Sequence, residues 1–241
     1  MTKHVLLNSV EHHDLRVIQT RGAEYGDALW FTLTFPAEFR SIQTHYPIFF
    51  QKDPANGQFL PVALFGFTHQ ENLFLQQDNW QGCYIPLSVR RQPFLIGQQT
   101  VLEDGVETVQ RVIHIDLDSA RVSTEHGEAL FLPLGGSSPV LDQAASMLET
   151  LHQGLLDTKH FVELLLQHQL LESFTLDVQL DNGQKHQMVG FYTIHEENLA
   201  ALSADVLAQL HSKGYLQAIY MAVASQSNVR HLLNLKNKQL K

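Results

Sequence analysis

The chain has 241 residues, of which 44% are hydrophobic and 17% charged, so it can bury a sizeable core as one large domain or two small ones. Its 25 Asp and Glu residues outnumber its 16 Lys and Arg residues. The resulting net charge of -9 argues against a general nucleic-acid binder, which needs a basic face, and against adsorption to an anionic membrane surface.

The first third of the chain has the patterns of strands and hairpins. Residues 27–35 alternate between two faces, as a strand with one buried face does. Pro36 predicts the first turn of a short helix that closes before Pro47. Two apolar runs flank residues 52–57, whose turn-forming residues predict a hairpin. Residues 71–75 predict a further short strand or extended piece.

The middle third carries weaker signals. Residues 86–92 predict one or two helical turns, ended by the effect of Pro93 on its predecessor. Asp104-Gly105 predicts a tight hairpin turn before a strand at residues 110–117. Residues 127–138 predict a short strand followed by a loop.

Helical spacing dominates the last hundred residues. Pro139 opens a predicted helix, and Asp157 or Thr158 is expected to cap a second one. Asn182-Gly183 predicts a hairpin turn, and Ser203 the N-cap of a helix that stops at Gly214. Residues 215–225 fit a buried strand or a helix, and the chain ends in a helix with a basic tail.

These elements predict an α+β fold, with a β-rich first part and a helix-rich second part. We expect a single domain over residues 1–241, with a possible subdivision into 1–135 and 136–241.

The same sequence predicts a soluble, cytoplasmic protein. Cys83 is the single cysteine, so no internal disulfide can form, as is typical of a reducing compartment. No apolar run approaches the roughly 20 residues of a membrane helix, and the first residues lack the apolar run of a signal peptide. Export by a route that needs no signal stays open.

Fourteen histidines raise the question of a metal site. His114 and Asp116 share a face of the predicted strand at 110–117 and, with a distant His, would form the facial triad of a non-haem iron oxygenase. The alternative is an exposed strand face, because such triplets arise by chance in a chain rich in His and Asp. No phosphate- or dinucleotide-binding motif and no serine-nucleophile motif occurs, and we predict no cofactor.

Two adjacent arginines, Arg90 and Arg91, stand in an otherwise apolar or small segment of this acidic chain. One interpretation is structural: the arginines pair with the acidic excess or cover apolar surface with their stems. The other is a bidentate grip on a carboxylate or phosphate. Consecutive helical residues do not share a face, so we expect one arginine to pair internally and one to face an acidic partner or ligand.

Three stretches of the chain resemble the SapC family of bacterial proteins. They are "YPIFFQKDPANGQFLPVALFGFTHQENLFL" with "CYIPLSVRRQPFLIG", then "HIDLDSARVSTEHGEALF", then "GFYTIHEENLAALSADVLAQLHSKGYLQAIYMAVASQSNVRHLL". The chain departs from the family pattern in two ways: an acidic residue often stands where His195 does, and the position of His114 is not fixed. Both departures argue against a metal site that uses His114 or His195 as a ligand.

The resemblance implies a link to bacterial surface layers and serum resistance, without a defined biochemical activity. Family members are often found near TonB-dependent receptors, flavin halogenase-like proteins and cupin-like oxygenases, which implies a helper in uptake or in substrate modification. A peptide-transporter permease shares the family name. The absence of predicted membrane spans argues against transferring that label.

The hypothesis we favour is a non-enzymatic interaction protein with a protein partner or an acidic ligand. Such a protein needs exposed apolar anchors and an arginine to orient the partner. The predicted binding residues are Tyr46, Trp80, Tyr84, Arg90, Arg91 and Phe94. Two alternatives remain: an iron-dependent oxygenase that uses His114 and Asp116, and a structural surface-layer subunit. The sequence leaves the oligomeric state open.

Overall fold

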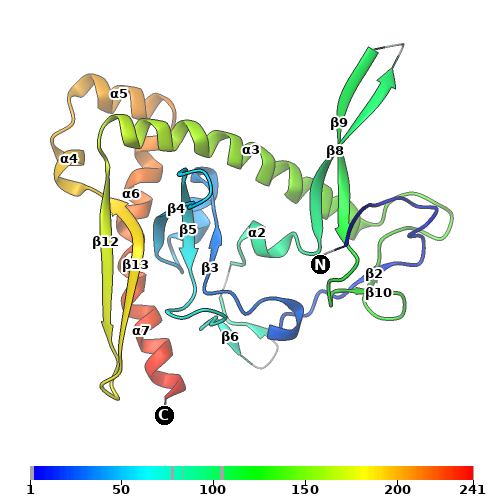
Figure 1. Ribbon diagram of the computed structural model, residues 1–241, viewed down its shortest axis with the longest axis horizontal. Coiled ribbons are helices and arrows are strands. Elements are labelled where there is room, and N and C mark those ends of the chain that lie inside the picture. The colour runs from blue at the N-terminus through cyan, green and yellow to red at the C-terminus, as the bar shows by residue number, and fades with distance from the viewer. Residues whose placement is uncertain (1–2, 77–78, 83, 104–105, 241) are drawn as a thin grey trace. The chain divides into compact units, whose positions relative to one another are not determined.

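The computed structural model describes residues 3–76, 79–82, 84–103 and 106–240, which form two compact units (Figure 1). Unit 1 consists of Met1–Asp27 and Leu87–His152, and unit 2 of Ala28–Pro86 and Gln153–Lys241. The first half of the chain is rich in strands and the C-terminal part is helical, which confirms the α+β prediction. The expectation of one domain over residues 1–241 stays a prediction.

Unit 1 contains two small antiparallel sheets. The first has the order β1-β9-β8 and consists of β1 (His4–Leu6), β8 (Phe94–Glu103) and β9 (Val106–Asp116). The second has the order β10-β2-β11 and consists of β2 (Arg16–Val17), β10 (Val122–Ser123) and β11 (Glu128–Ala129). Two short helices, η1 (Ala23–Tyr25) and α2 (Leu87–Arg90), complete this part.

The core of unit 1 joins both sheets to the start of the long helix α3 (Pro139–Gln167). Its buried members are Leu15, Val17, Phe94, Ile115, Leu130, Leu141, Ala144 and Leu148. The predicted helical turns at 86–92 and the strand at 110–117 are confirmed by α2 and β9. The predicted turn at Asp104-Gly105 lies outside the described residues.

Unit 2 is built on a five-stranded antiparallel sheet with the order β12-β13-β4-β5-β3. Its strands are β3 (Phe31–Leu33), β4 (Ile48–Lys52), β5 (Phe59–Leu64), β12 (Leu171–Gln179) and β13 (Lys185–Ile194). Both hairpins predicted from turn residues, β4–β5 and β12–β13, are confirmed. A small two-stranded ribbon consists of β6 (Leu75–Gln76) and β7 (Asn79–Trp80).

Helices complete unit 2. Besides residues 153–167 of α3, they are η2 (Pro36–Glu38), α1 (Phe39–Ile42), α4 (Glu196–Ala200), α5 (Ala204–Ser212), α6 (Tyr215–Ser225) and α7 (Asn228–Gln239). Two predicted helix starts are confirmed: Pro36 stands in the first turn of η2, and Ser203 is the N-cap of α5, where its side chain accepts the Val206 N–H. The segment that fitted a strand or a helix is helix α6, and it packs against β4 and β13.

One prediction about the helices is wrong. The sequence suggested a new helix capped at Asp157 or Thr158, but α3 runs without a break through both residues. Thr158 Oγ1 donates to the Gly154 carbonyl one turn earlier, and Asp157 accepts a hydrogen bond from Tyr215. Both side chains therefore make hydrogen bonds from within a continuous helix and do not cap a new one. Across the described part of the chain, no helix has the length and apolar character needed to cross a membrane.

Candidate functional site

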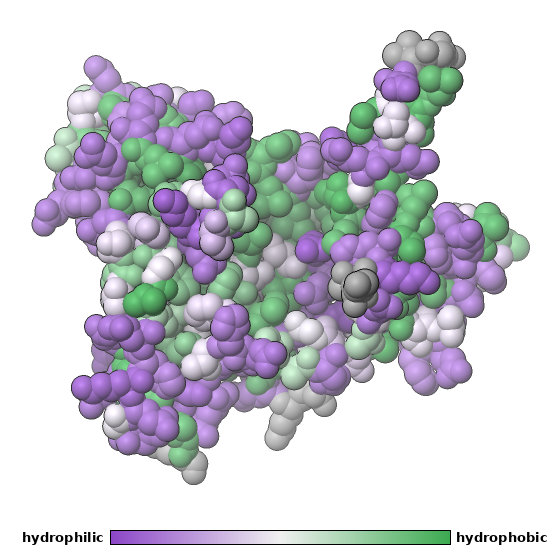
Figure 2. All heavy atoms as spheres, viewed as in Figure 1, coloured by the Kyte–Doolittle hydropathy of each residue, from purple (hydrophilic) through white to green (hydrophobic). Residues whose placement is uncertain are grey.

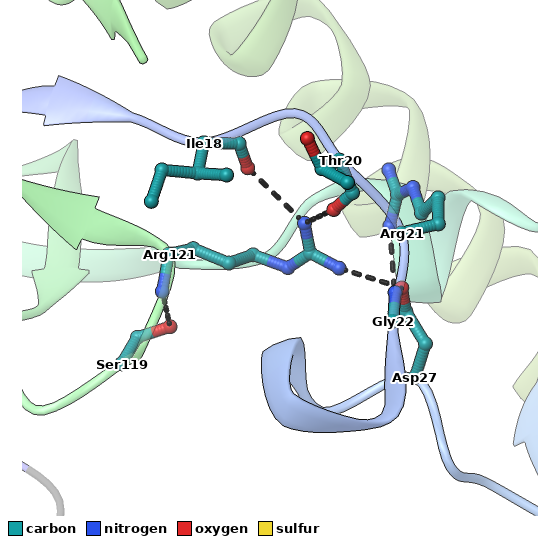
Figure 3. A network of polar contacts seen from close by, with 7 residues as sticks. All are labelled: Ile18, Thr20, Arg21, Gly22, Asp27, Ser119 and Arg121. Carbon is teal, nitrogen blue, oxygen red and sulfur yellow. Dashed lines mark hydrogen bonds and ion pairs between the residues drawn. The ribbon is translucent and has the colours of Figure 1, made fainter. Parts of the chain in front are cut away.

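A buried carboxylate organises the loop that ends the first segment of unit 1. Asp27 is fully buried, and its Oδ2 accepts the Gly22 N–H at 3.0 Å (Figure 3). The Asp27 N–H donates back to the Gly22 carbonyl at 3.2 Å, and Gly26 takes a φ of 85° that favours glycine. Residues 22–27 thus form a closed loop around η1 that presents one carboxylate inward.

Arg121 occupies the space in front of this carboxylate. Its Nη2 donates to Asp27 Oδ2 at 2.7 Å, and its Nη1 donates to the carbonyls of Ile18 at 3.1 Å and Thr20 at 2.8 Å (Figure 3). The guanidinium also lies 5.5 Å from the centre of the Tyr25 ring. Arg121 is only 1% exposed, so its charge depends on this pairing. Its Nε has no hydrogen-bond partner among the described residues.

A second arginine contacts the same carboxylate, and the charge of a third acts on that second arginine. Arg21 Nη1 contacts Asp27 Oδ1 at 3.3 Å, and its side chain is 12% exposed. Burial lowers the pKa of Arg21, the positive charges of Arg121 and Arg90 lower it further, and Asp27 opposes the change. Arg90 is therefore close enough to act on Arg21 electrostatically. We call Arg21, Arg90 and Arg121 the arginine cluster; with Asp27 it carries a local charge of +2.

Arg90 and Arg91 have different surroundings. Arg90 is exposed, and no hydrogen bond or ion pair joins it to another residue of the described chain. Arg91 is half-buried, its Nη1 donates to the Phe94 carbonyl at 2.8 Å, and burial lowers its pKa. Phe94 is 3% exposed and belongs to the core of unit 1. In the geometry of this segment, Arg91 and Phe94 hold the turn between α2 and β8 while Arg90 points outward.

The three other predicted binding residues lie in unit 2 and are joined by hydrogen bonds. Trp80 Nε1 donates to the Tyr46 hydroxyl at 2.8 Å, which donates to the Tyr84 carbonyl at 2.5 Å. The Tyr84 hydroxyl donates to Glu38 Oε1 at 2.8 Å, and Thr34 donates to Oε2 at 2.7 Å. Tyr46 is 0% and Trp80 5% exposed, so both serve the interior of unit 2.

His114 and Asp116 share a face of β9, as predicted. The His114 ring packs on Gly97, where a Cβ would overlap it, and Asp116 Oδ2 lies 3.9 Å from His4 Nε2. Within the described ranges, no group of three or more His, Cys, Asp or Glu side chains is placed to hold a metal ion. Among the described residues there is therefore no metal-binding group that supplies a third ligand for this pair. Cys83 lies outside the described residues.

Sequence reasoning missed Asp27, Arg21 and Arg121. Arg121 and Asp27 are 94 residues apart, and neither stands in a motif. Periodicity and turn signals are local, so they carry no information about such a pair. The acidic excess of the chain also makes a single aspartate inconspicuous.

A family model described as SapC matches residues 7–232 of the chain. No curated protein and no solved structure matches the chain.

Proposed function

Because the chain belongs to the SapC family, matched over residues 7–232, we propose that it is a non-enzymatic accessory protein that binds an acidic partner through Arg90. The observation that carries the proposal is the position of Arg90. It is exposed and lacks an ion-pair partner among the described residues, and its positive charge helps to lower the pKa of Arg21, which contacts Asp27.

The surroundings of Arg90 favour an external carboxylate over an internal one. Asp27 is buried and already accepts hydrogen bonds from Arg121, Arg21 and the Gly22 amide. The negative charge of Asp27 is therefore already paired with Arg21 and Arg121. A guanidinium presents a planar fork that matches a carboxylate with two parallel hydrogen bonds.

The local scaffold limits the entropy that binding removes. Val89 is 0% exposed and anchors α2, and Arg91 ties the following turn to the Phe94 carbonyl. The backbone that carries Arg90 is therefore held before a partner arrives, which reduces the ordering cost of binding. The aromatic side chains of Tyr46 and Trp80 are internal, so the proposed contact rests on Arg90.

The family resemblance supports a place for this contact among cell-surface systems. In this proposal the acidic partner belongs to an uptake or modification system associated with TonB-dependent receptors. The net charge of -9 repels acidic partners at long range, so the attraction at Arg90 is local and weakens as salt screens it.

The test is an affinity capture of the tagged chain at native expression level, followed by mass spectrometry. We compare wild type with Arg90→Glu and with Arg40→Glu, an exposed arginine of unit 2 that serves as the matched control. We expect Arg90→Glu to reduce recovery of the partner about tenfold, equivalent to 1.4 kcal/mol, and the control to retain it.

Equal recovery with Arg90→Glu and wild type would overturn the proposal. Metal analysis of the same eluate tests the oxygenase alternative. Iron near one atom per chain, lost in His114→Ala or Asp116→Ala, would replace the accessory role with an enzymatic one.

A further inference from the structure

The hairpin of β8 and β9 extends beyond the sheet that it belongs to. Strand β1 pairs with β9 only from His114 to Asp116, whereas β8 and β9 pair along their whole lengths. The remainder is a two-stranded ribbon that projects from unit 1 (Figures 1 and 2). Leu102 is 71% and Val109 64% exposed on it. Two strands alone are marginally stable, and an open edge is a template for another strand.

The backbone groups that face the open edge of β9 can be identified. The open edge of β9 is the continuation, beyond the end of β1, of the side on which β1 pairs. The Leu7 N–H donates to the Ile113 carbonyl at 2.9 Å, so the backbone groups of Ile113 face this side. The Asp116 N–H donates to the Pro93 carbonyl, so the backbone groups of Asp116 face the opposite, β8 side. In an antiparallel strand both backbone groups of a residue point to the same side, and successive residues alternate. The β8–β9 register has no shift, so Arg111, Val109 and Glu107 face the open edge.

These three residues also share one face of the ribbon, and their order is self-complementary. An antiparallel pair of β9 strands centred on Val109 places Val109 opposite the partner's Val109 and Glu107 opposite the partner's Arg111. The arrangement forms two opposite-charge cross-strand pairs around an apolar one, and each kind stabilises a sheet. Over the described residues, no strand pairs with β9 on this side between Glu107 and Arg111.

We propose that the chain forms a homodimer by antiparallel pairing of the β9 edges, centred on Val109. The two ribbons then make a four-stranded sheet with the two-fold symmetry usual for dimers. The outer edge of β8 fits this role less well. Its outward-facing residues, Gln98, Thr100 and Leu102, carry no charges that would fix a register between two copies.

Arg111 is available for this contact. Its Nη2 contacts Glu149 at 3.2 Å, and both side chains are 48% exposed. A guanidinium has five N–H donors, so one contact leaves donors for the partner's Glu107. Exposed ion pairs of this kind restrain a side chain little.

The experiment is sedimentation velocity over a concentration series, with a matched pair of proline variants. Val109→Pro removes an N–H that faces the open edge, and Thr100→Pro removes one that faces the outer edge of β8 from the position directly opposite Val109. Proline is tolerated where an edge N–H faces solvent. We expect a dimer for wild type and Thr100→Pro and a monomer for Val109→Pro. A monomeric wild type at every concentration overturns the proposal, as does a dimer that only Thr100→Pro abolishes.

Charge exchange gives a test that does not depend on proline. Glu107→Arg and Arg111→Glu each place like charges opposite one another, and we expect each to weaken the dimer at least tenfold. The double variant restores opposite charges and is expected to dimerise again. A double variant that stays monomeric while it retains the wild-type circular dichroism overturns the register. Arg90→Glu is expected to leave the dimer intact, which separates this result from the proposed partner binding.

Discussion

Arg121 and Asp27 form a fully buried ion pair, with Nη2 and Oδ2 2.7 Å apart, between segments separated by 94 residues. Their pairing connects the loop at residues 22–27 to the turn that precedes β10. The other pair of the cluster, Arg21 with Asp27, is longer at 3.3 Å and partly exposed. Arg121 is therefore the partner on which the buried carboxylate depends most.

Replacement of Arg121 by alanine is expected to destabilise unit 1 by about 3 kcal/mol, because it leaves Asp27 buried with a weaker partner. Arg16→Ala is the control, since Arg16 contacts the Gly127 carbonyl at the surface, and we expect less than about 1 kcal/mol for it. Both tryptophans, Trp30 and Trp80, belong to unit 2, so a probe within unit 1 is needed. Amide hydrogen exchange of β8, β9 and β10 gives the measurement, and equal protection in both variants would contradict the prediction.

Arg90→Ala and Arg91→Ala should differ in stability. Arg91 donates to the Phe94 carbonyl from a half-buried position, so its loss is expected to destabilise unit 1 by about 1–2 kcal/mol. Arg90 is exposed, and its removal is expected to change stability by less than about 0.5 kcal/mol. The same amide-exchange measurement compares the two, and a larger effect from Arg90 would contradict the assignment of their roles.

Tyr46→Phe is expected to destabilise unit 2 by about 1–3 kcal/mol, because the buried Trp80 Nε1–H and the Tyr84 carbonyl both lose a partner. Urea unfolding followed by tryptophan fluorescence measures the loss of stability.

Gly82→Ala is expected to disturb the same hydrogen bonds of Tyr46, because a Cβ at residue 82 would overlap the Tyr46 hydroxyl. Additive effects of the two changes in a double variant would show that they act at separate places.

Tyr215 gives unit 2 a dependence on alkaline pH. Its hydroxyl donates to Asp157 at 2.5 Å, and burial first, then this hydrogen bond and the carboxylate charge, raise its pKa above the usual 10.0. The unfolded chain loses the phenol proton near pH 10 while the folded chain keeps it, so the stability from this proton is complete below pH 10 and falls as pH rises further. Relative to Tyr215→Phe, the wild type should therefore lose stability above pH 10 in urea unfolding curves. Parallel curves for the two proteins would refute the prediction.

Local signals predicted much of this fold. Asn182-Gly183, Ser203 and Pro36 act through their own backbone geometry or caps, and the structure shows each in the predicted role. Asp157 was misjudged because its carboxylate is used by Tyr215, 58 residues away, which no local pattern reveals.

The candidate site was less predictable for the same reason. Arg90 and Arg91 stood out by their position in an acidic chain, whereas Asp27 and Arg121 did not. Strand β8 was also missed, because its alternation is interrupted by Gly97 and a pair of glutamines. Contacts between distant segments decide these features, and the sequence does not display them as a pattern.

Each unit is made of two separate stretches of the chain, and this interleaving sets an order of events during synthesis. On the ribosome, Asp27 emerges long before Arg121, and β4 long before its neighbour β13. Unit 1 can close once residue 152 has emerged, while residues 28–86 still lack the second stretch of unit 2. The edge of β4 that pairs with β13 therefore stays open until Lys185–Ile194 have been made, and an unpaired strand edge makes a nascent chain prone to aggregation.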